Sequence, residues 1–285
     1  MTSNTLKRCF VGGVHMPLSE RDRGSILQSR MTSFNREYWG KHIADRAHCR
    51  LVMEAKSPPD YRLLYDSWLW RYVLEASNRW KRDALILELL PGTSLTIPVA
   101  LQSAQYQGTL YRLNDEPAVP LPEVLQFADR WIRGELTDLA SGPLLYDFVI
   151  GNHVIDDLLF NLYCRDPEER KALYVDAERC RHTWESMARL GYLLVYRIQL
   201  AEVFAGLVRN MKNPSTLILR HYPSTFALVS DDLIRINAEM EAYFTIARTL
   251  TRIEQSDCFF LDVSSVNVPP GSKYPESFLV LQKGG

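Results

Sequence analysis

The sequence predicts an α/β protein built on a doubly wound, mostly parallel sheet, and three observations support this fold class. From residue 81 onward, short apolar runs alternate with stretches of helical periodicity. The first run, residues 84–90, is apolar except for Glu88 and ends in a Pro-Gly turn, which is typical of a strand buried on both faces. The last two runs, residues 258–268 and 277–282, flank a Pro-Pro-Gly turn and predict an antiparallel hairpin that supplies an edge strand.

The elements follow in a regular order. Strands are predicted over residues 84–90, 108–113, 130–134, 146–151, 215–221, 258–268 and 277–282. Helices are predicted over residues 95–105 and 121–129, from residue 153 onward, and over 192–211 and 231–254. A polar helical stretch over residues 165–190 indicates an insertion, at about residues 160–192, into the α/β domain.

The N-terminal part of the chain differs in character. Residues 1–34 are polar and mixed and are interpreted as an arm, whereas residues 35–80 have helical spacing interrupted by Pro58-Pro59. We therefore expect an N-terminal arm and helical cap over residues 1–80 and an α/β domain over residues 81–285.

The charge composition argues against a nucleic-acid-binding protein. The chain of 285 residues carries 33 Lys and Arg against 34 Asp and Glu, a net charge of -1. Because nucleic-acid binding depends on clustered positive charge, this balance argues against a nucleic-acid partner. A small-molecule substrate is the expected partner, and a homodimer is left open.

Cysteine usage and targeting signals indicate the cellular compartment in which a protein is expected. Five scattered cysteines show no Cys-x-x-Cys pair and no Cys/His ligand spacing, so neither a metal site nor a disulfide framework is predicted. No secretory segment precedes the chain's first predicted elements, and no apolar stretch reaches the ~18 residues that span a bilayer. We expect a cytoplasmic protein with no membrane partner.

The end of the first strand is where a ligand is expected, because open parallel sheets bind ligands beyond the carboxyl ends of their strands. Glu88 is an acid in an apolar strand, and its burial is costly unless a partner or ligand satisfies it. Gly92 permits close backbone approach to a ligand, and Thr93 opens the following helix.

This segment resembles the first motif of class I S-adenosylmethionine-dependent methyltransferases, which have a Rossmann-like fold. Against the form Glu-Ile-Gly-Pro-Gly-Thr-Gly, the matching residues are Glu88, Pro91, Gly92 and Thr93, whereas Leu90 and Ser94 stand where glycines are usual. Later segments match in order over roughly residues 80–285, including the fourth predicted strand and the closing residues 276–283. The resemblance implies an enzyme with S-adenosylmethionine as its cofactor.

The resemblance also implies further cofactor contacts. Asn114 or Asp115, after the second strand, takes the position that holds the ribose hydroxyls, and Glu135 with Leu136 takes the position beside the adenine. Asn152 follows the fourth strand and is expected to contact the cofactor and the reacting groups.

The reacting end is expected after the fourth and fifth strands, at Asn152, His153, Asp156, Asp157, His221 and Tyr222. His153 is the favoured general base, because an ordinary histidine pKa of about 6.5 suits proton removal at neutral pH. Tyr192 is proposed as a catalytic residue from an aromatic lid over the sulfonium. For each of these residues, a purely structural role stays open.

Two reactions are open. The first is methyl transfer to a small molecule. The second is attack on the aminocarboxypropyl arm of the cofactor with release of methylthioadenosine, as in azetidine-2-carboxylate synthases. The departures at Leu90 and Ser94 lie where the amino-acid end of the cofactor rests, which favours keeping the second reaction. A binding protein that retains the fold without activity is the third interpretation.

Overall fold

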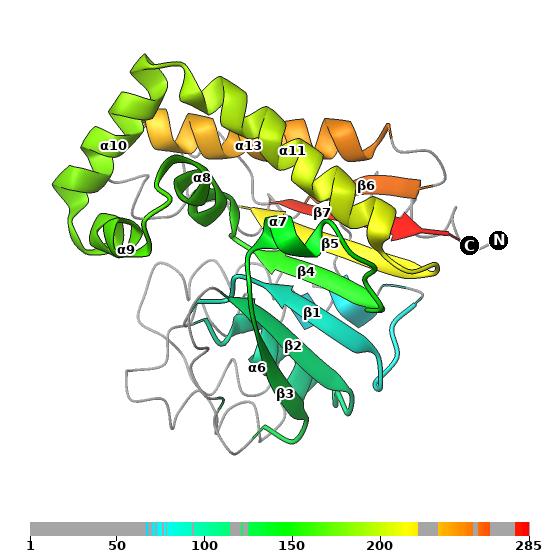
Figure 1. Cartoon of the computed structure of the whole chain (residues 1–285). Coiled ribbons are helices and arrows are strands. Elements are labelled where there is room, and N and C mark those ends of the chain that lie inside the picture. Colours follow the sequence, from blue (N-terminus) through cyan, green and yellow to red (C-terminus); the bar gives the residue numbers. More distant parts are fainter. Residues whose placement is uncertain are drawn as a thin grey trace, which may run out of the picture. The chain divides into compact units, whose positions relative to one another are not determined.

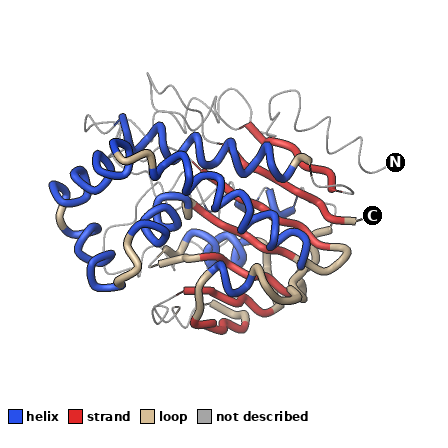
Figure 2. The backbone as a smooth tube through the Cα atoms, turned by 45° about the horizontal axis from the view of Figure 1, so that its top comes forward, coloured by secondary structure: helices blue, strands red, loops and turns tan. Residues whose placement is uncertain are grey.

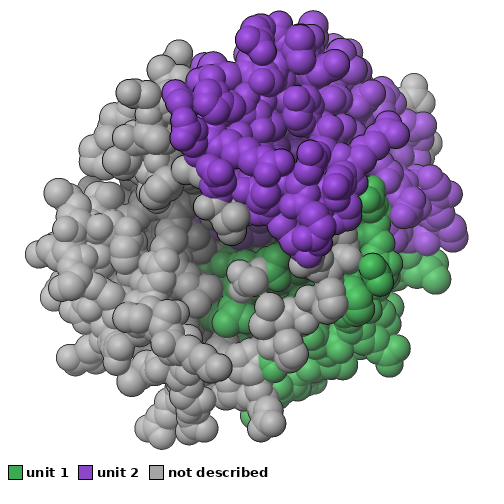
Figure 3. Space-filling view, turned by 60° about the vertical axis from the view of Figure 1, so that its left-hand side comes forward, with its two compact units in different colours: residues 1–135, 145–150 green, residues 136–144, 151–285 purple. Residues whose placement is uncertain are grey.

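The computed structural model describes residues 67, 70–71, 73–75, 77, 79–92, 94–114, 121, 125–221, 233–252, 256–262 and 277–284. The chain forms two compact units, unit 1 with residues 1–135 and 145–150, and unit 2 with residues 136–144 and 151–285 (Figure 3). The predicted arm and cap over residues 1–80 lie almost entirely outside the described residues, as do Thr93, Asp115 and Tyr222. The predicted domain boundaries therefore stay a prediction.

Seven strands form one sheet in the order β3-β2-β1-β4-β5-β7-β6 (Figure 1). Their bounds are β1 Leu85–Leu89, β2 Thr109–Asn114, β3 Ala128–Arg133, β4 Phe148–Asn152, β5 Ser215–His221, β6 Ser256–Asp262 and β7 Ser277–Lys283. β1, β2 and β3 are parallel neighbours, and β7 is antiparallel to both β5 and β6. The predicted doubly wound, mostly parallel sheet with an antiparallel C-terminal hairpin is confirmed. The antiparallel strand β7 lies between β5 and β6, so the strand at the edge is β6.

The core of unit 1 is built around β1. Residues Ile86 to Leu89 are buried, and helix α6, Thr96–Ser103, is buried along its whole length. The Asp147 carboxylate accepts a hydrogen bond of 2.7 Å from the backbone amide of Leu85, and the backbone amide of Asp147 donates one of 2.8 Å to the carbonyl of Leu85. Asp147 therefore anchors the start of β1 to the segment before β4.

The prediction of a helix over residues 121–129 is wrong wherever the structure describes that segment. Residues 125–127 are not helical, and residues 128–133 form β3. Two features favour the strand. Its backbone pairs in register with β2 from Thr109 to Asn114, and Asp129 forms a bidentate ion pair with Arg112 at 2.8 and 2.5 Å. Five of the six β3 residues are exposed, so hydrophobic periodicity carries no signal here.

Unit 2 contains α7, which precedes β4, and the described helices that follow β4. They are α7 Leu136–Leu139, α8 Ile155–Tyr163, α9 Pro167–Val175, α10 Ala177–Arg189, α11 Tyr192–Asn210 and α13 Leu233–Leu250. Asp166 caps α9 by accepting from the amide of Glu168, and Asp176 caps α10 by accepting from the amide of Arg179. α11 and α13 run side by side in both views (Figures 1 and 2). The predicted helical insertion corresponds to α9 and α10, whereas α7 was not predicted because it has only four residues.

No single described helix is both long enough and apolar enough to cross a bilayer. One bent pair of helices, Glu178–Arg189 with Tyr192–Asn210, has the required length and composition.

Candidate active site

The first group of predicted residues lies at the carboxyl ends of three neighbouring strands in unit 1. After β1 the chain turns through two residues with positive φ, Leu90 at 45° and Gly92 at 53°. The amide of Leu90 bonds to the carbonyl of Leu113 on β2 at 2.8 Å, and the amide of Ser94 closes the turn onto Pro91 at 2.9 Å. No described atom lies within 4 Å of the position that a Cβ of Gly92 would take. The turn is thus held by backbone bonds and leaves space over Gly92.

Glu88 lies on β1 just before this turn and is 1% exposed. Its Oε2 atom has no hydrogen-bond partner among the described residues. Burial raises the pKa of Glu88 to about 8, although the positive charge of Arg112 acts in the opposite direction. An orphaned carboxyl oxygen in a core is costly, which is why such a group points to a missing partner.

Asn114 and Glu135 lie at the next two strand ends. Asn114 is the last residue of β2 and pairs in register with Arg133 of β3. The amide of Gly134 donates to the carbonyl of Asn114 at 3.3 Å, and Glu135 is the residue that follows this hydrogen bond. The structure therefore brings Glu88, Gly92 and Asn114 to one edge of unit 1. Leu136 belongs to unit 2, where it begins α7 and is buried.

A second group lies in unit 2, where β4 and β5 end. Asn152 is the last residue of β4, His153 follows it, and His221 is the last residue of β5. The amide of His153 donates to the carbonyl of Arg220 at 2.9 Å. The two imidazole rings stack with centroids 4.9 Å apart and an angle of 23° between their planes. His153 has a φ of 58°, which is unusual for a residue with a side chain and marks local strain.

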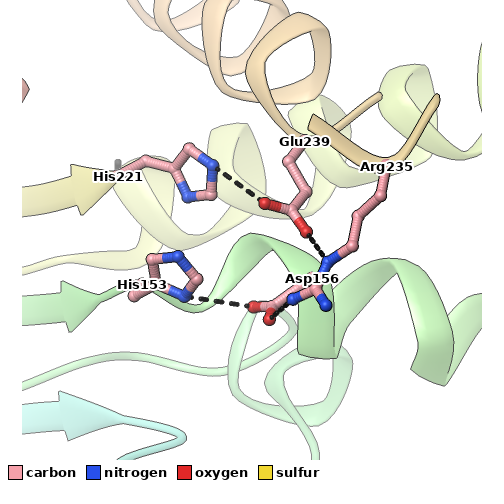
Figure 4. Close-up of polar contacts among 5 residues, drawn as sticks. All are labelled: His153, Asp156, His221, Arg235 and Glu239. Carbon is pink, nitrogen blue, oxygen red and sulfur yellow. Dashed lines mark hydrogen bonds and ion pairs between the residues drawn. The ribbon is translucent and has the colours of Figure 1, made fainter. Parts of the chain in front are cut away.

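Three charged residues complete this group, which we call the histidine cluster: His153, Asp156, His221, Arg235 and Glu239 (Figure 4). Arg235 of α13 bridges both carboxylates, with 2.9 Å from Nη2 to Asp156 Oδ2 and 2.5 Å from Nε to Glu239 Oε1. Asp156 Oδ1 lies 3.5 Å from His153 Nδ1, and Glu239 Oε2 lies 3.5 Å from His221 Nε2. Each histidine therefore faces a carboxylate that the arginine holds in place.

The two histidines of the cluster titrate in opposite directions. Burial acts to lower the pKa of His153, but the negative charge and hydrogen bond of Asp156 outweigh it and raise this pKa to about 9. Burial lowers the pKa of His221, and the neighbouring His153 adds to this effect. Burial acts to raise the pKa of Asp156, but its contacts with His153 and Arg235 outweigh burial and hold this pKa well below its usual range. At neutral pH the pair thus consists of one protonated and one neutral imidazole.

The predicted catalytic Tyr192 lies at the start of α11 and is 41% exposed. Its ring stacks on Tyr196 with centroids 5.6 Å apart, and Tyr163 of α8 lies 5.9 Å away. This aromatic group lies in unit 2. Its role as a lid stays a prediction.

Sequence reasoning missed Arg235 and Glu239. The two residues are one helical turn apart on α13, a spacing that ordinarily indicates an exposed ion pair. The signal that could have found them is the placement of Glu239, which falls in a run of buried apolar residues that includes Ile236 and Met240.

Comparison with known proteins gives a likeness in structure alone. No protein-family model matches the chain, and no curated protein matches it. The O-methyltransferase TomG from Streptomyces achromogenes, solved with SAM, is 10% identical over 88% of this chain and 96% of its own, with a TM-score of 0.46. The plantazolicin methyltransferase BpumL, solved with SAH, is 12% identical over 100% of both chains, with a TM-score of 0.45. An O-methyltransferase from Klebsiella pneumoniae, described as putative, is 10% identical over 88% and 96%, with a TM-score of 0.42.

These scores lie below 0.5, so the fold rests on the strand order itself. The sheet begins with the strands in the order 3-2-1-4-5, of which β1, β2 and β3 pair in parallel, and β7 inserts antiparallel between β5 and β6. The chain has the fold of the class I S-adenosylmethionine-dependent methyltransferases. In this methyltransferase fold, ligands bind at the carboxyl ends of the strands, where the turn after β1 and the histidine cluster both lie.

Proposed function

We propose that this protein is an S-adenosylmethionine-dependent methyltransferase acting on a small molecule. The proposal rests on two features that occur together. Glu88 has a buried carboxyl oxygen without a hydrogen-bond partner among the described residues, and the nearby turn is open at Gly92. Both lie at the carboxyl end of β1, where this fold binds its ligand.

The chemistry of these residues fits the cofactor. S-adenosylmethionine carries a sulfonium and an ammonium group, and a positive ligand offers Glu88 the partner that its Oε2 atom lacks. The open position over Gly92 lets the ligand approach the backbone. Pro91 and Thr93 are proposed to shape the same turn, Asn114 or Asp115 to hold the ribose hydroxyls, and Glu135, Leu136 and Asn152 to complete the adenosine contacts.

The transfer itself asks little of the protein, because the sulfonium already activates the carbon that is transferred. Alignment of the acceptor with that carbon and exclusion of water supply most of the acceleration. We propose that His153, whose side chain is 16% exposed, contacts the acceptor and that Asn152 orients it. Tyr192 is proposed to present an aromatic face to the sulfonium, an attraction worth about 0.5–2 kcal/mol.

A second reaction is retained because of one observation. Leu90 occupies a glycine position of the motif and takes a φ of 45°. We propose that its side chain displaces the amino-acid end of the cofactor. A cofactor displaced in this way exposes its aminocarboxypropyl arm to attack. The product would then be methylthioadenosine, with cyclisation or transfer of that arm.

Product analysis separates these reactions. The purified protein is incubated with S-adenosylmethionine alone and with a panel of small hydroxyl and amine acceptors, and the nucleoside products are identified by mass spectrometry. We expect S-adenosylhomocysteine that depends on an added acceptor. Methylthioadenosine without any acceptor would replace the methyltransferase proposal by the second reaction.

A further inference from the structure

We propose that His153, His221 and Glu239 form a binding site for a divalent first-row transition metal ion. One ligand atom from each residue lies within 4.8 Å of the other two. The three residues come from three elements of unit 2: the residue after β4, the end of β5 and the middle of α13. No short sequence spacing joins them, which explains why the sequence predicts no metal.

His221 gives the strongest evidence for a missing partner. Its side chain is 0% exposed, and neither ring nitrogen has a hydrogen-bond partner among the described residues. Buried imidazoles ordinarily bond through at least one nitrogen, because leaving both unsatisfied costs stability. Coordination of a metal by one nitrogen supplies the partner that the protein lacks.

Glu239 has an oxygen available for the metal. Arg235 occupies Oε1, whereas Oε2 faces His221 Nε2 at 3.5 Å. Asp156 faces Nδ1 of His153 and is itself held by Arg235. Carboxylates that orient a ligating histidine in this way are typical of protein metal sites. The histidine cluster thus contains three ligands together with the groups that orient them.

The spacing of the two rings suits binding to one ion. With metal–nitrogen bonds of about 2.1 Å, two imidazoles at roughly 90–110° around a metal have centroids about 4.5–5.2 Å apart. The observed separation of His153 and His221 is 4.9 Å, but the rings stack at 23°, so one ring has to rotate before both nitrogen lone pairs point at the same ion. Side-chain rotation then needs to draw the widest pair of ligand atoms together by about 1.5 Å to reach normal coordination distances.

The charge of the cluster also accommodates a cation. Asp156 and Glu239 contribute two negative charges against the single positive charge of Arg235, so a neutral His153 leaves the cluster at -1. A divalent ion that replaces the His153 proton adds positive charge to the cluster, and the two carboxylates offset part of that charge. The partial exposure of His153 and Arg235, at 16% and 21%, gives the ion a route to the buried His221 and Glu239.

Two imidazoles and one carboxylate suit zinc, iron, cobalt or nickel, and three protein ligands leave coordination positions open for water or an acceptor oxygen. The proposal does not depend on the proposed methyltransferase function. His153 belongs to both proposals, but His221 and Glu239 are not among the residues proposed to contact the cofactor or the acceptor. The metal site is therefore tested without S-adenosylmethionine.

The test is titration of chelator-treated full-length protein with Co²⁺ and Zn²⁺. We expect one ion per chain by elemental analysis, visible cobalt absorption bands that Zn²⁺ displaces, and a rise in Tm with either ion. His221→Gln and Glu239→Gln are expected to weaken cobalt binding at least tenfold. The matched control is His182→Gln, because His182 is an exposed histidine of α10 between two glutamates and its loss should leave binding unchanged.

The outcomes are decisive in either direction. Absence of cobalt bands and of any Tm shift in the folded wild-type protein would overturn the proposal, and so would equal binding by the wild type and a folded Glu239→Gln variant. If both substitutions prevent folding, the cobalt form of the wild-type protein is tested by itself. Ligation by two imidazoles is then visible in the hyperfine shifts of the histidine ring protons. Shifts from a single histidine would contradict the site.

Discussion

Glu88 is a carboxyl group within an apolar strand, and its burial determines how it responds to pH. Its pKa is raised to about 8 by burial, against an ordinary value of 4.5. Between these two values the folded protein retains a proton that the unfolded chain has lost. The contribution of Glu88 to stability therefore falls as pH rises from 4.5 to 8 and changes no further above that range.

Glu88→Gln removes this dependence, because glutamine stays neutral. In the absence of ligand, we expect the free energy of unfolding of the wild type to fall by about 2 to 3 kcal/mol, relative to the variant, between pH 5.5 and 7.5. Urea unfolding at several pH values measures this difference. Glu202→Gln on α11 is the matched control, since its side chain is 67% exposed. A constant difference between wild type and Glu88→Gln would show that Glu88 already has a partner.

At the residue scale, part of the candidate site could be predicted from the sequence. Glu88, His153 and His221 are polar residues at or beside the ends of apolar runs, and such positions mark the ligand-binding edge of a parallel sheet. The opposite pKa shifts of the two histidines could not be predicted, because they depend on the burial of both rings and on the charges that the fold places around each of them. The preference for His153 as general base rested on its ordinary pKa alone.

At the scale of elements, the start of β2 is fixed against the residue before β1. The Tyr106 hydroxyl donates to the carbonyl of Ala84 at 2.6 Å, and Gly108 packs against the same carbonyl. A Cβ on Gly108 would lie 2.4 Å from that oxygen and 2.7 Å from the Tyr106 hydroxyl. Only a residue without a side chain fits, which aligns β2 with β1.

We therefore expect Gly108→Ala to destabilise the protein by about 1–3 kcal/mol, as overpacking of a well-filled site does. Thermal unfolding monitored by circular dichroism measures the change. Gly142→Ala is the matched control, because no described atom lies within 4 Å of its added Cβ. Equal melting temperatures for the two variants would contradict the close approach of β2 to Ala84.

The elements with a clear hydrophobic pattern were the ones that could be predicted. β5 is buried at every position and its predicted range is the observed one, while β1 and α11 differ from prediction by a residue or two. The sequence predicts β3 as a strand over residues 130–134 but assigns its first two residues to a helix. An exposed edge strand has no apolar face, and its start depends on pairing with β2 and on the Arg112–Asp129 ion pair. Local sequence contains neither of these long-range contacts.

At the scale of the whole molecule, the strand order establishes the fold, whereas the reaction rests on a few residues at strand ends. The turn after β1 in unit 1 and the histidine cluster in unit 2 both follow from the same rule, that parallel strands present their carboxyl ends to ligands. The central claim is that the first of these features binds S-adenosylmethionine.

Isothermal titration calorimetry with S-adenosylmethionine tests that claim most directly. We expect saturable binding of one cofactor per chain by the wild type, with at least a tenfold loss in Gly92→Val, because the new side chain would fill the open position over the turn. Gly191→Val controls for backbone strain, since Gly191 also has a positive φ, at 73°, and open space around it but lies before α11. We expect this control to bind like the wild type. Folded wild-type protein that gives no binding heat at any temperature tested, or binding that Gly92→Val leaves intact, would contradict the account.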